Sequence, residues 1–279
     1  MSQIQADIDF LLSVSRAKPK PGDETGQLIS AALIRVFKEG YNGNHSRYPT
    51  EDLALHRGRI GPPGQLYEKL SDLWYPPSQF SKQGRAHLSG ESLLYCAAGS
   101  ATAILELRPK RGDIICMMEG RVEKSPLLTK MIMDEQLYDP LSISEESKAF
   151  ERFIAKEFRR VPNGPRDYLI CGALGSLFFK FTSIEAIMYT SMATDLAGVN
   201  FAFAAPIADK FLKPTKFRAY EVVAAGGLAE CQVRCRAHAG AASADGTIPW
   251  EQISQCSGHR LSEAFLRKPG TCDGTRNPT

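Results

Sequence analysis

The chain has 279 residues, 43% of them hydrophobic and 23% charged, which is the balance of an ordinary globular protein. This length suffices for one large domain, or for a core domain with flanking elaborations. The formal net charge is +3 and the basic residues are spread along the chain, so nothing favours a nucleic-acid partner, which would need a concentrated basic face.

The N-terminal ten residues include Asp7 and Asp9 and lack the basic and apolar regions of a secretory signal. No apolar run approaches the roughly 20 residues that a bilayer span needs. The cysteines number seven, and an odd number in a long chain favours free thiols over a disulfide framework. We therefore expect a cytoplasmic protein without a membrane partner.

The first half of the chain predicts helices followed by short strands. Residues 4–14 are amphipathic, and 23–39 carry apolar residues at helical spacing, with Gly40 as a C-terminal stop. Residues 53–84 are rich in turn residues, and we expect them to be irregular. Apolar runs predict strands over 93–96 and 113–118, and 101–107 reads as a helix that leads into a strand.

The second half begins with a helix over 142–158, where Ser142 and Glu145 have the spacing of a capping box. A second helix is predicted over 168–181, and strands over 187–189, 199–204 and 217–224. Because these elements show no regular βαβ rhythm, the sequence predicts an α+β fold. We expect an N-terminal helical extension over 1–50, a core over 51–225 and a C-terminal extension over 226–279 packed on that core.

Residues suited to dinucleotide chemistry gather in the core. Arg57 and Arg85 lie in Gly-flanked segments, where a guanidinium fork can match phosphate oxygens. Tyr95 offers a stacking face, and Glu106 is a carboxylate in an apolar run, which is costly unless the group is paired or functional. Such a carboxylate could stabilise a positive, oxocarbenium-like sugar carbon. The alternative is a structural ion pair between Glu106 and Arg108.

Four blocks in this region resemble the RES-domain family, whose pattern runs Tyr-Arg-x-Arg, Gly-Arg-(Trp/Phe/Ala)-Asn-Pro-x-Gly, Leu-Tyr-x-(Ala/Ser) and Ala-x-x-Glu-(Val/Leu)-Arg-Pro. In this chain they read His56-Arg57-Gly58-Arg59, Gly84-Arg85-Ala86-His87, Leu94-Tyr95-Cys96-Ala97 and Ala103-Ile104-Leu105-Glu106-Leu107-Arg108-Pro109. A later family block corresponds to Glu185-Ala186-Ile187-Met188-Tyr189-Thr190-Ser191, then Gly198-Val199-Asn200. The step from Tyr95 to Glu106 matches the family spacing, and the resemblance extends from Leu53 to Phe203.

This resemblance implies a fold similar to ADP-ribosyltransferases, a mixed β core with flanking helices, in an enzyme that consumes NAD as its substrate without a further cofactor. It implies that Arg57 binds the NAD phosphates, Arg85 supports the pocket, Tyr95 faces nicotinamide and Glu106 is the key carboxylate. Ser191 is the clear serine in a matching block and is expected to line the same pocket. Many members of the family are toxins neutralised by a partner with an Xre-type helix-turn-helix domain.

The chain departs from the family pattern at three places, which read His87-Leu88 for Asn-Pro, Glu185-Ala186 for Asp-Gly, and Cys171-Gly172 where a Ser or Thr is expected. We expect an NAD-consuming enzyme, a glycohydrolase or phosphorylase that cleaves the nicotinamide–ribose bond. The alternatives are a transferase that modifies an acceptor protein with ADP-ribose and, because of these departures, a binding module for NAD or ADP-ribose that has lost turnover.

Three further signals have two interpretations each. His56 is either a pocket residue in place of the family's aromatic or a packed structural histidine. Cys96 and Cys171 are read as buried small hydrophobes rather than nucleophiles. The third signal is a group of possible zinc ligands, namely Cys231, Cys235, His238, Cys256 and His259. We read its cysteines instead as free thiols on a strand and a loop, and we predict no metal.

Overall fold

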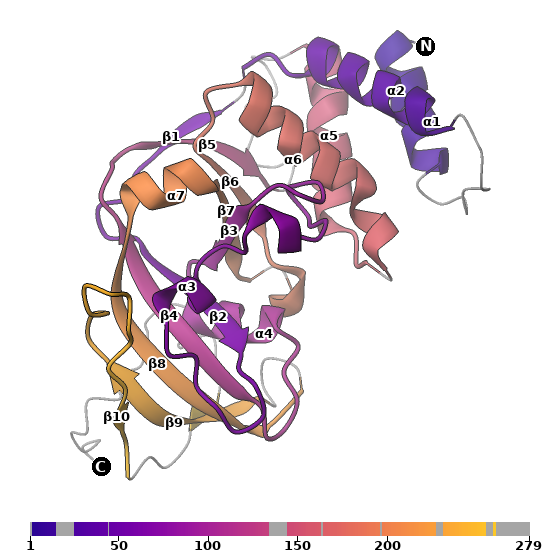
Figure 1. Ribbon diagram of the computed structural model, residues 1–279. Coiled ribbons are helices and arrows are strands. Elements are labelled where there is room, and N and C mark those ends of the chain that lie inside the picture. The colour runs from indigo at the N-terminus through magenta and orange to yellow at the C-terminus, as the bar shows by residue number, and fades with distance from the viewer. Residues whose placement is uncertain are drawn as a thin grey trace. The chain divides into compact units, whose positions relative to one another are not determined.

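The computed structural model describes residues 2–14, 25–43, 45–133, 144–162, 164–195, 197–226, 231–254 and 259–260. The chain forms two compact units, each assembled from three segments, and the α+β class predicted from the sequence is confirmed (Figure 1). Unit 1 comprises Met1–Tyr48, Pro77–Leu93 and Leu127–Tyr189, and unit 2 comprises Pro49–Pro76, Leu94–Pro126 and Thr190–Thr279.

Unit 1 combines four helices with three strands among its described residues. The helices are α1 (Gln3–Val14), α2 (Thr25–Gly40), α5 (Glu145–Arg159) and α6 (Leu169–Phe181), with short 3₁₀ turns η1 (Ser78–Phe80) and η3 (Pro165–Tyr168). The strands are β1 (Ser46–Tyr48), β5 (Leu127–Ile132) and β6 (Ala186–Thr190), in the order β1-β5-β6. β1 pairs with β5 antiparallel, whereas β5 pairs with β6 in parallel.

Aromatic side chains hold the helices of unit 1 together. Phe37 of α2 packs edge-on against Phe150 of α5 and Phe178 of α6, with ring centroids 6.3 and 5.2 Å apart. Beside these rings, the buried Lys130 of β5 donates to Glu151 of α5 at 2.5 Å. An apolar stripe on each helix and one enclosed ion pair therefore make up this core.

Unit 2 is built on a sheet with the order β7-β3-β2-β4-β8-β9-β10, and β11 also pairs with β9. Its strands are β2 (Ala54–Ile60), β3 (Leu93–Ala97), β4 (Ile114–Val122), β7 (Val199–Ala204), β8 (Leu212–Ala224), β9 (Gln232–Ala239), β10 (Glu251–Gln252) and β11 (His259–Arg260). Its helices are α3 (Leu70–Leu73), α4 (Ser100–Glu106) and α7 (Ala205–Phe211), with the 3₁₀ turn η4 (Met192–Thr194). The long strands β4 and β8 run antiparallel side by side, as Figure 1 shows.

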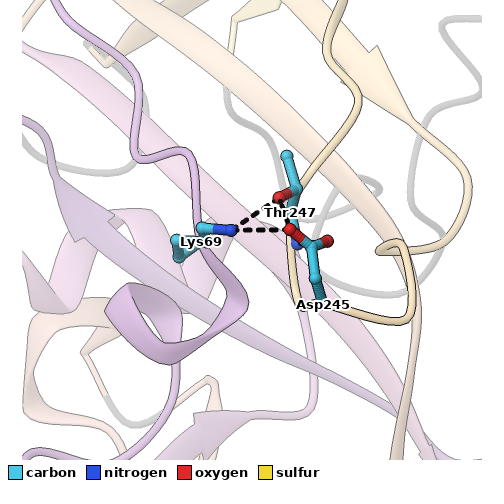
Figure 2. Close-up of polar contacts among 3 residues, drawn as sticks. All are labelled: Lys69, Asp245 and Thr247. Carbon is cyan, nitrogen blue, oxygen red and sulfur yellow. Dashed lines mark hydrogen bonds and ion pairs between the residues drawn. The ribbon is translucent and has the colours of Figure 1, made fainter.

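The segment before α3 is fastened to the loop after β9. Lys69 Nζ donates to Asp245 Oδ2 at 2.9 Å and to Thr247 Oγ1 at 2.7 Å (Figure 2). The Leu70 amide donates to the Gly246 carbonyl at 2.8 Å. These contacts join the start of α3 to a stretch of chain far along the sequence.

Two sequence expectations about the elements are wrong. Residues 53–84 are not irregular throughout, because β2 and α3 form within them. The His-Arg-Gly-Arg stretch lacks a clean apolar alternation, yet it forms a strand because β3 and β4 pair with it on either side. The segment 101–107 does not lead into a strand either. α4 ends at Glu106, and Arg108 turns the chain with φ +49°.

The other predicted elements form with shifted ends. The predicted strand over 217–224 begins earlier, at Leu212, and β5 had no prediction. α5 begins at Glu145, where the Ser144 side chain accepts from the Ser147 amide at 3.2 Å as N-cap. Ser142, the predicted capping residue, lies outside the described residues.

Candidate active site

The carboxylate of Glu106 is the centre of a polar cluster within unit 2. Glu106 is the last residue of α4 and is exposed. Its Oε1 accepts hydrogen bonds from Ser191 Oγ and from Asn200 Nδ2, both at 2.6 Å. Ser191 and Asn200 are themselves buried. The structure therefore brings two of the predicted site residues, Glu106 and Ser191, into direct contact.

The loop that carries Ser191 is braced against α4. The Ser191 amide donates to the Gly198 carbonyl, and the Gly198 amide donates to Thr194 Oγ1, both at 2.8 Å. A Cβ on Gly198 would collide with the Thr102 side chain of α4, so only glycine permits this close approach. These contacts hold the Ser191 segment against α4, next to Glu106.

Within the part of the chain that the structure describes, the hydrogen bonds of the Glu106 carboxylate go to Oε1 and none goes to Oε2. Among the described residues, no ion pair joins Glu106 to Arg108, which disfavours the structural pairing considered from the sequence. Two charge-assisted bonds on Oε1 hold the carboxylate in one orientation. Oε2 can then interact with a ligand at the exposed side of the cluster.

Arg57 and Arg59 both bind the C-terminal end of α3. Arg57 Nε donates to the Leu73 carbonyl at 2.8 Å and Nη1 donates to the Tyr95 carbonyl at 2.9 Å. Arg59 Nη1 donates to the Asp72 carbonyl. Carbonyls at a helix C-terminus carry partial negative charge, so cations are favoured there. Burial lowers the pKa of Arg57, although a guanidinium remains protonated in proteins.

The strand register separates Arg57 from Tyr95 by face. His56 pairs with Ala97 across β2 and β3, so Tyr95, two residues before Ala97, shares the face of His56. Arg57, the next residue along β2, lies on the opposite face. The face of His56 is the one covered by α4, because a Cβ on Gly58 would lie 3.0 Å from Leu107. Tyr95 thus projects on the side of α4, and Arg57 on the side of α3.

Arg85 belongs to unit 1, and its guanidinium also binds carbonyls. It donates to the carbonyls of Phe158 and Arg160 at the end of α5, and it lies 5.5 Å from the centroid of the Tyr168 ring. The turn that carries Arg85 packs tightly on α6, where a Cβ on Gly172 would come within 2.7 Å of the Gly84 carbonyl.

Two of the residues that depart from the family pattern, His87 and Cys171, are buried inside unit 1. His87 is buried and lies 3.1 Å from Ser81 Oγ. Cys171 is fully buried, and Cys96 of unit 2 is almost fully buried. Burial raises the pKa of both thiols to about 12. Both cysteines are confirmed as buried small residues. Thiols with such a pKa are poor nucleophiles.

Asn200 and Glu119 were not predicted as site residues, and the structure shows both as buried polar residues. Asn200 interrupts an apolar strand, and Glu119 follows the apolar run Ile114–Met118. In both cases a lone polar residue in an apolar strand was the available signal, because such a group needs a partner or a function.

Cys231 and Cys235 are buried in the apolar core of unit 2, where Cys235 Sγ donates to the Ala237 carbonyl at 3.6 Å. Cys256 lies outside the described residues. Within the described ranges, no group of three or more His, Cys, Asp or Glu residues could hold a metal ion. In the same ranges, no helix has the length and apolar character to cross a membrane.

The comparisons with known proteins identify the family. The model of the RES domain matches residues 58–224, which is more than half of the chain and includes Tyr95, Glu106, Ser191 and Asn200. No curated protein was found to match the chain. The chain belongs to the RES domain family.

Proposed function

We propose that this protein cleaves the bond between nicotinamide and ribose in NAD, with Glu106 as the catalytic carboxylate. The observation that carries the proposal is the pair of 2.6 Å hydrogen bonds that fix Oε1 of Glu106 and leave Oε2 for the substrate. A carboxylate oriented in advance stabilises positive charge without reorganisation when the reaction occurs.

In this reaction the C1′–N bond breaks and its electron pair goes to the pyridinium nitrogen, so nicotinamide leaves as a neutral molecule. Positive charge develops at the ribose carbon, as in glycoside hydrolysis. The negative charge of Glu106 stabilises that charge. Water then adds to C1′ and loses a proton, which gives ADP-ribose and H⁺. Phosphate or a nucleophilic protein side chain could replace water as the acceptor.

The other predicted residues take roles that fit their contacts. Tyr95 projects on the α4 side of the sheet, where its ring could stack on nicotinamide. Arg57 holds the Tyr95 main chain, so we assign it a positioning role. Arg85 holds the end of α5 in unit 1. Direct phosphate contacts by Arg57 and Arg85 stay predictions.

The cellular role follows from the chemistry. An enzyme that depletes NAD inside its own cell arrests growth unless a partner inhibits it, and this supports a toxin with a neutralising protein partner. The Xre-type antitoxin implied by the family resemblance is the partner that we propose. Expression in a bacterial host, with intracellular NAD measured over time, tests this role.

The decisive experiment follows nicotinamide and ADP-ribose chromatographically after NAD is added to the purified protein. We expect both products from the wild-type protein and a loss of roughly 100-fold or more in rate for Glu106→Gln. Glu123→Gln is the matched control, because Glu123 is an exposed carboxylate of unit 2 paired with Lys213 at 3.1 Å. Equal rates for wild type and Glu106→Gln contradict the proposal.

The same assay separates the acceptors. Hydrolysis gives free ADP-ribose, phosphorolysis gives its 1″-phosphate when inorganic phosphate is present, and transfer places labelled ADP-ribose on protein. Binding of intact NAD without any nicotinamide release would identify the protein as a binding module.

A further inference from the structure

A second polar cluster of unit 2 lies on the α4 side of the sheet. His56 of β2 and Glu119 of β4 are directly opposite each other in the antiparallel register. His56 is 1% exposed and Glu119 is 7% exposed. Lys216 and Arg218 of β8 lie beside Glu119, with Lys216 Nζ 3.8 Å from Oε1 and Arg218 Nη1 3.6 Å from Oε2.

Two buried atoms of this cluster lack a hydrogen-bond partner among the described residues. They are His56 Nε2 and Glu119 Oε2. Native proteins pair nearly all buried polar atoms, so each exception calls for an explanation such as a bound ligand or water. Two exceptions on residues that face each other across neighbouring strands indicate one shared partner.

The charges of the cluster narrow the chemistry of that partner. Glu119 can only accept a hydrogen bond, so the partner must donate one. An anion is disfavoured by Glu119, and a further cation is disfavoured because Lys216 and Arg218 already balance its charge. Burial lowers the pKa of His56 to about 4, so the imidazole is neutral near pH 7 and its Nε2 acts as a donor in one tautomer and as an acceptor in the other.

A vicinal pair of hydroxyl groups meets these requirements. One hydroxyl donates to the carboxylate while its neighbour pairs with the imidazole. Side chains directly opposite on antiparallel strands have Cβ atoms about 5 Å apart, which suits two adjacent hydroxyls between them. Ribose carries such a pair, and NAD contains two riboses.

We infer that His56 and Glu119 form a subsite for the 2′ and 3′ hydroxyls of a ribose. The identification of the ribose as part of NAD rests on the proposed function, whereas the hydroxyl chemistry rests on the two buried atoms. Arg218 and Lys216 flank the Glu119 carboxylate, and His56 is the residue that this chain carries beside Arg57.

Two ligand pairs test the subsite and distinguish the two riboses by calorimetry. ADP and 2′,3′-dideoxy-ADP differ only in the hydroxyls of the adenosine ribose, and ADP-ribose and ADP differ in the second ribose. If the subsite holds the adenosine ribose, we expect the wild-type protein to bind ADP roughly tenfold more tightly than 2′,3′-dideoxy-ADP. If it holds the second ribose, we expect ADP-ribose to bind roughly tenfold more tightly than ADP. His56→Phe and Glu119→Gln should each bring that ratio close to one.

His238→Phe is the matched control, because His238 is a half-exposed histidine of β9 in the same unit, and it should keep the wild-type ratio. His56→Gln replaces His56→Phe if the latter does not fold. Ratios that are equal in wild type and in both variants overturn the subsite, as does a wild type without preference in either pair. A site that holds only a bound water would also give a wild-type protein without preference in either pair.

The outcomes separate this inference from the proposed function. Nicotinamide release that depends on Glu106, together with unchanged ratios, overturns the ribose subsite alone. Ratios that fall in the variants, without any nicotinamide release, overturn the cleavage proposal alone. Absence of binding by ADP and ADP-ribose overturns the subsite, and if nicotinamide release is absent as well, both proposals fail.

Discussion

Arg57 donates a hydrogen bond from Nη1 to the main-chain carbonyl of Tyr95, 2.9 Å away. Its Nε donates to the Leu73 carbonyl at the end of α3. One guanidinium therefore fixes α3 and the strand of Tyr95 together. A phosphate ligand at Arg57 would have to share the guanidinium with these carbonyls. Whether Arg57 supports the structure or binds a phosphate can therefore be measured.

Arg57→Lys tests the supporting role, because an ammonium group cannot reproduce the planar fork. We expect the free energy of unfolding to fall by about 1–3 kcal/mol, since at least one carbonyl loses its donor. We expect kcat to fall while KM for NAD changes little. Urea unfolding and nicotinamide release measure the two effects, and Arg121→Lys, at an exposed position of β4, is the control. A raised KM with unchanged stability would indicate a phosphate contact instead.

Ser191 and Asn200 are expected to act as one unit on Glu106. Ser191→Ala and Asn200→Ala each remove one of the two donors to Oε1, so the carboxylate gains freedom to rotate. Each should lower the rate of nicotinamide release by roughly tenfold to 100-fold, which is less than the loss in Glu106→Gln. Because both donors hold the same atom, the double variant should lose less than the product of the single losses. Wild-type rates in both single variants would exclude this positioning role.

Gly175 of α6 is expected to tolerate no larger residue. An added Cβ would collide with the main chain of Ala86, in the turn that carries Arg85. Gly175→Ala should therefore destabilise unit 1 by about 1–3 kcal/mol, although alanine favours helices. Gly164→Ala is the control, since an added Cβ there meets nothing within 4 Å. Thermal unfolding compares the two variants, and equal melting temperatures would mean that the turn shifts without strain.

Most of the predicted apolar elements formed, because burial produced their patterns, although the apolar strand β5 was missed. The strand β7 begins and ends at the predicted residues, and α6 begins one residue after the predicted start. β2 escaped prediction because pairing on both sides, rather than its own side chains, makes it a strand. Its His56 and Arg57 alternate between the two faces of the sheet, and without the strand that alternation could not be inferred.

The chemistry of the site was predictable in part. The family blocks located Glu106 and Ser191 but could not show that these two residues are in contact, since 85 positions separate them. The arginines illustrate a physical ambiguity. A guanidinium in a Gly-flanked segment suits a phosphate and a helix C-terminus alike, because both present oxygens with negative charge. Only the folded structure shows that these guanidinium groups bind the Leu73 and Phe158 carbonyls.

His56 is expected to make the protein less stable in acid. Its folded pKa of about 4 lies below the ordinary value of 6.5, because burial disfavours the imidazolium more than Glu119 favours it. The unfolded chain therefore binds more protons between these two values, and stability must fall as pH falls through this window. From pH 7 to pH 4.5 the contribution of His56 should fall by about 2 kcal/mol.

Urea unfolding of wild type and His56→Phe at both pH values isolates this effect. Glu119, Lys216 and Arg218, which face or flank His56, are present in both proteins, so the difference between the two proteins reports on His56. The variant should lose less stability in acid than the wild type. At pH 7 it should be nearly as stable, since Phe leaves no buried Nε2 without a partner. Identical losses in the two proteins would mean that His56 is protonated, or reached by water, in the folded state.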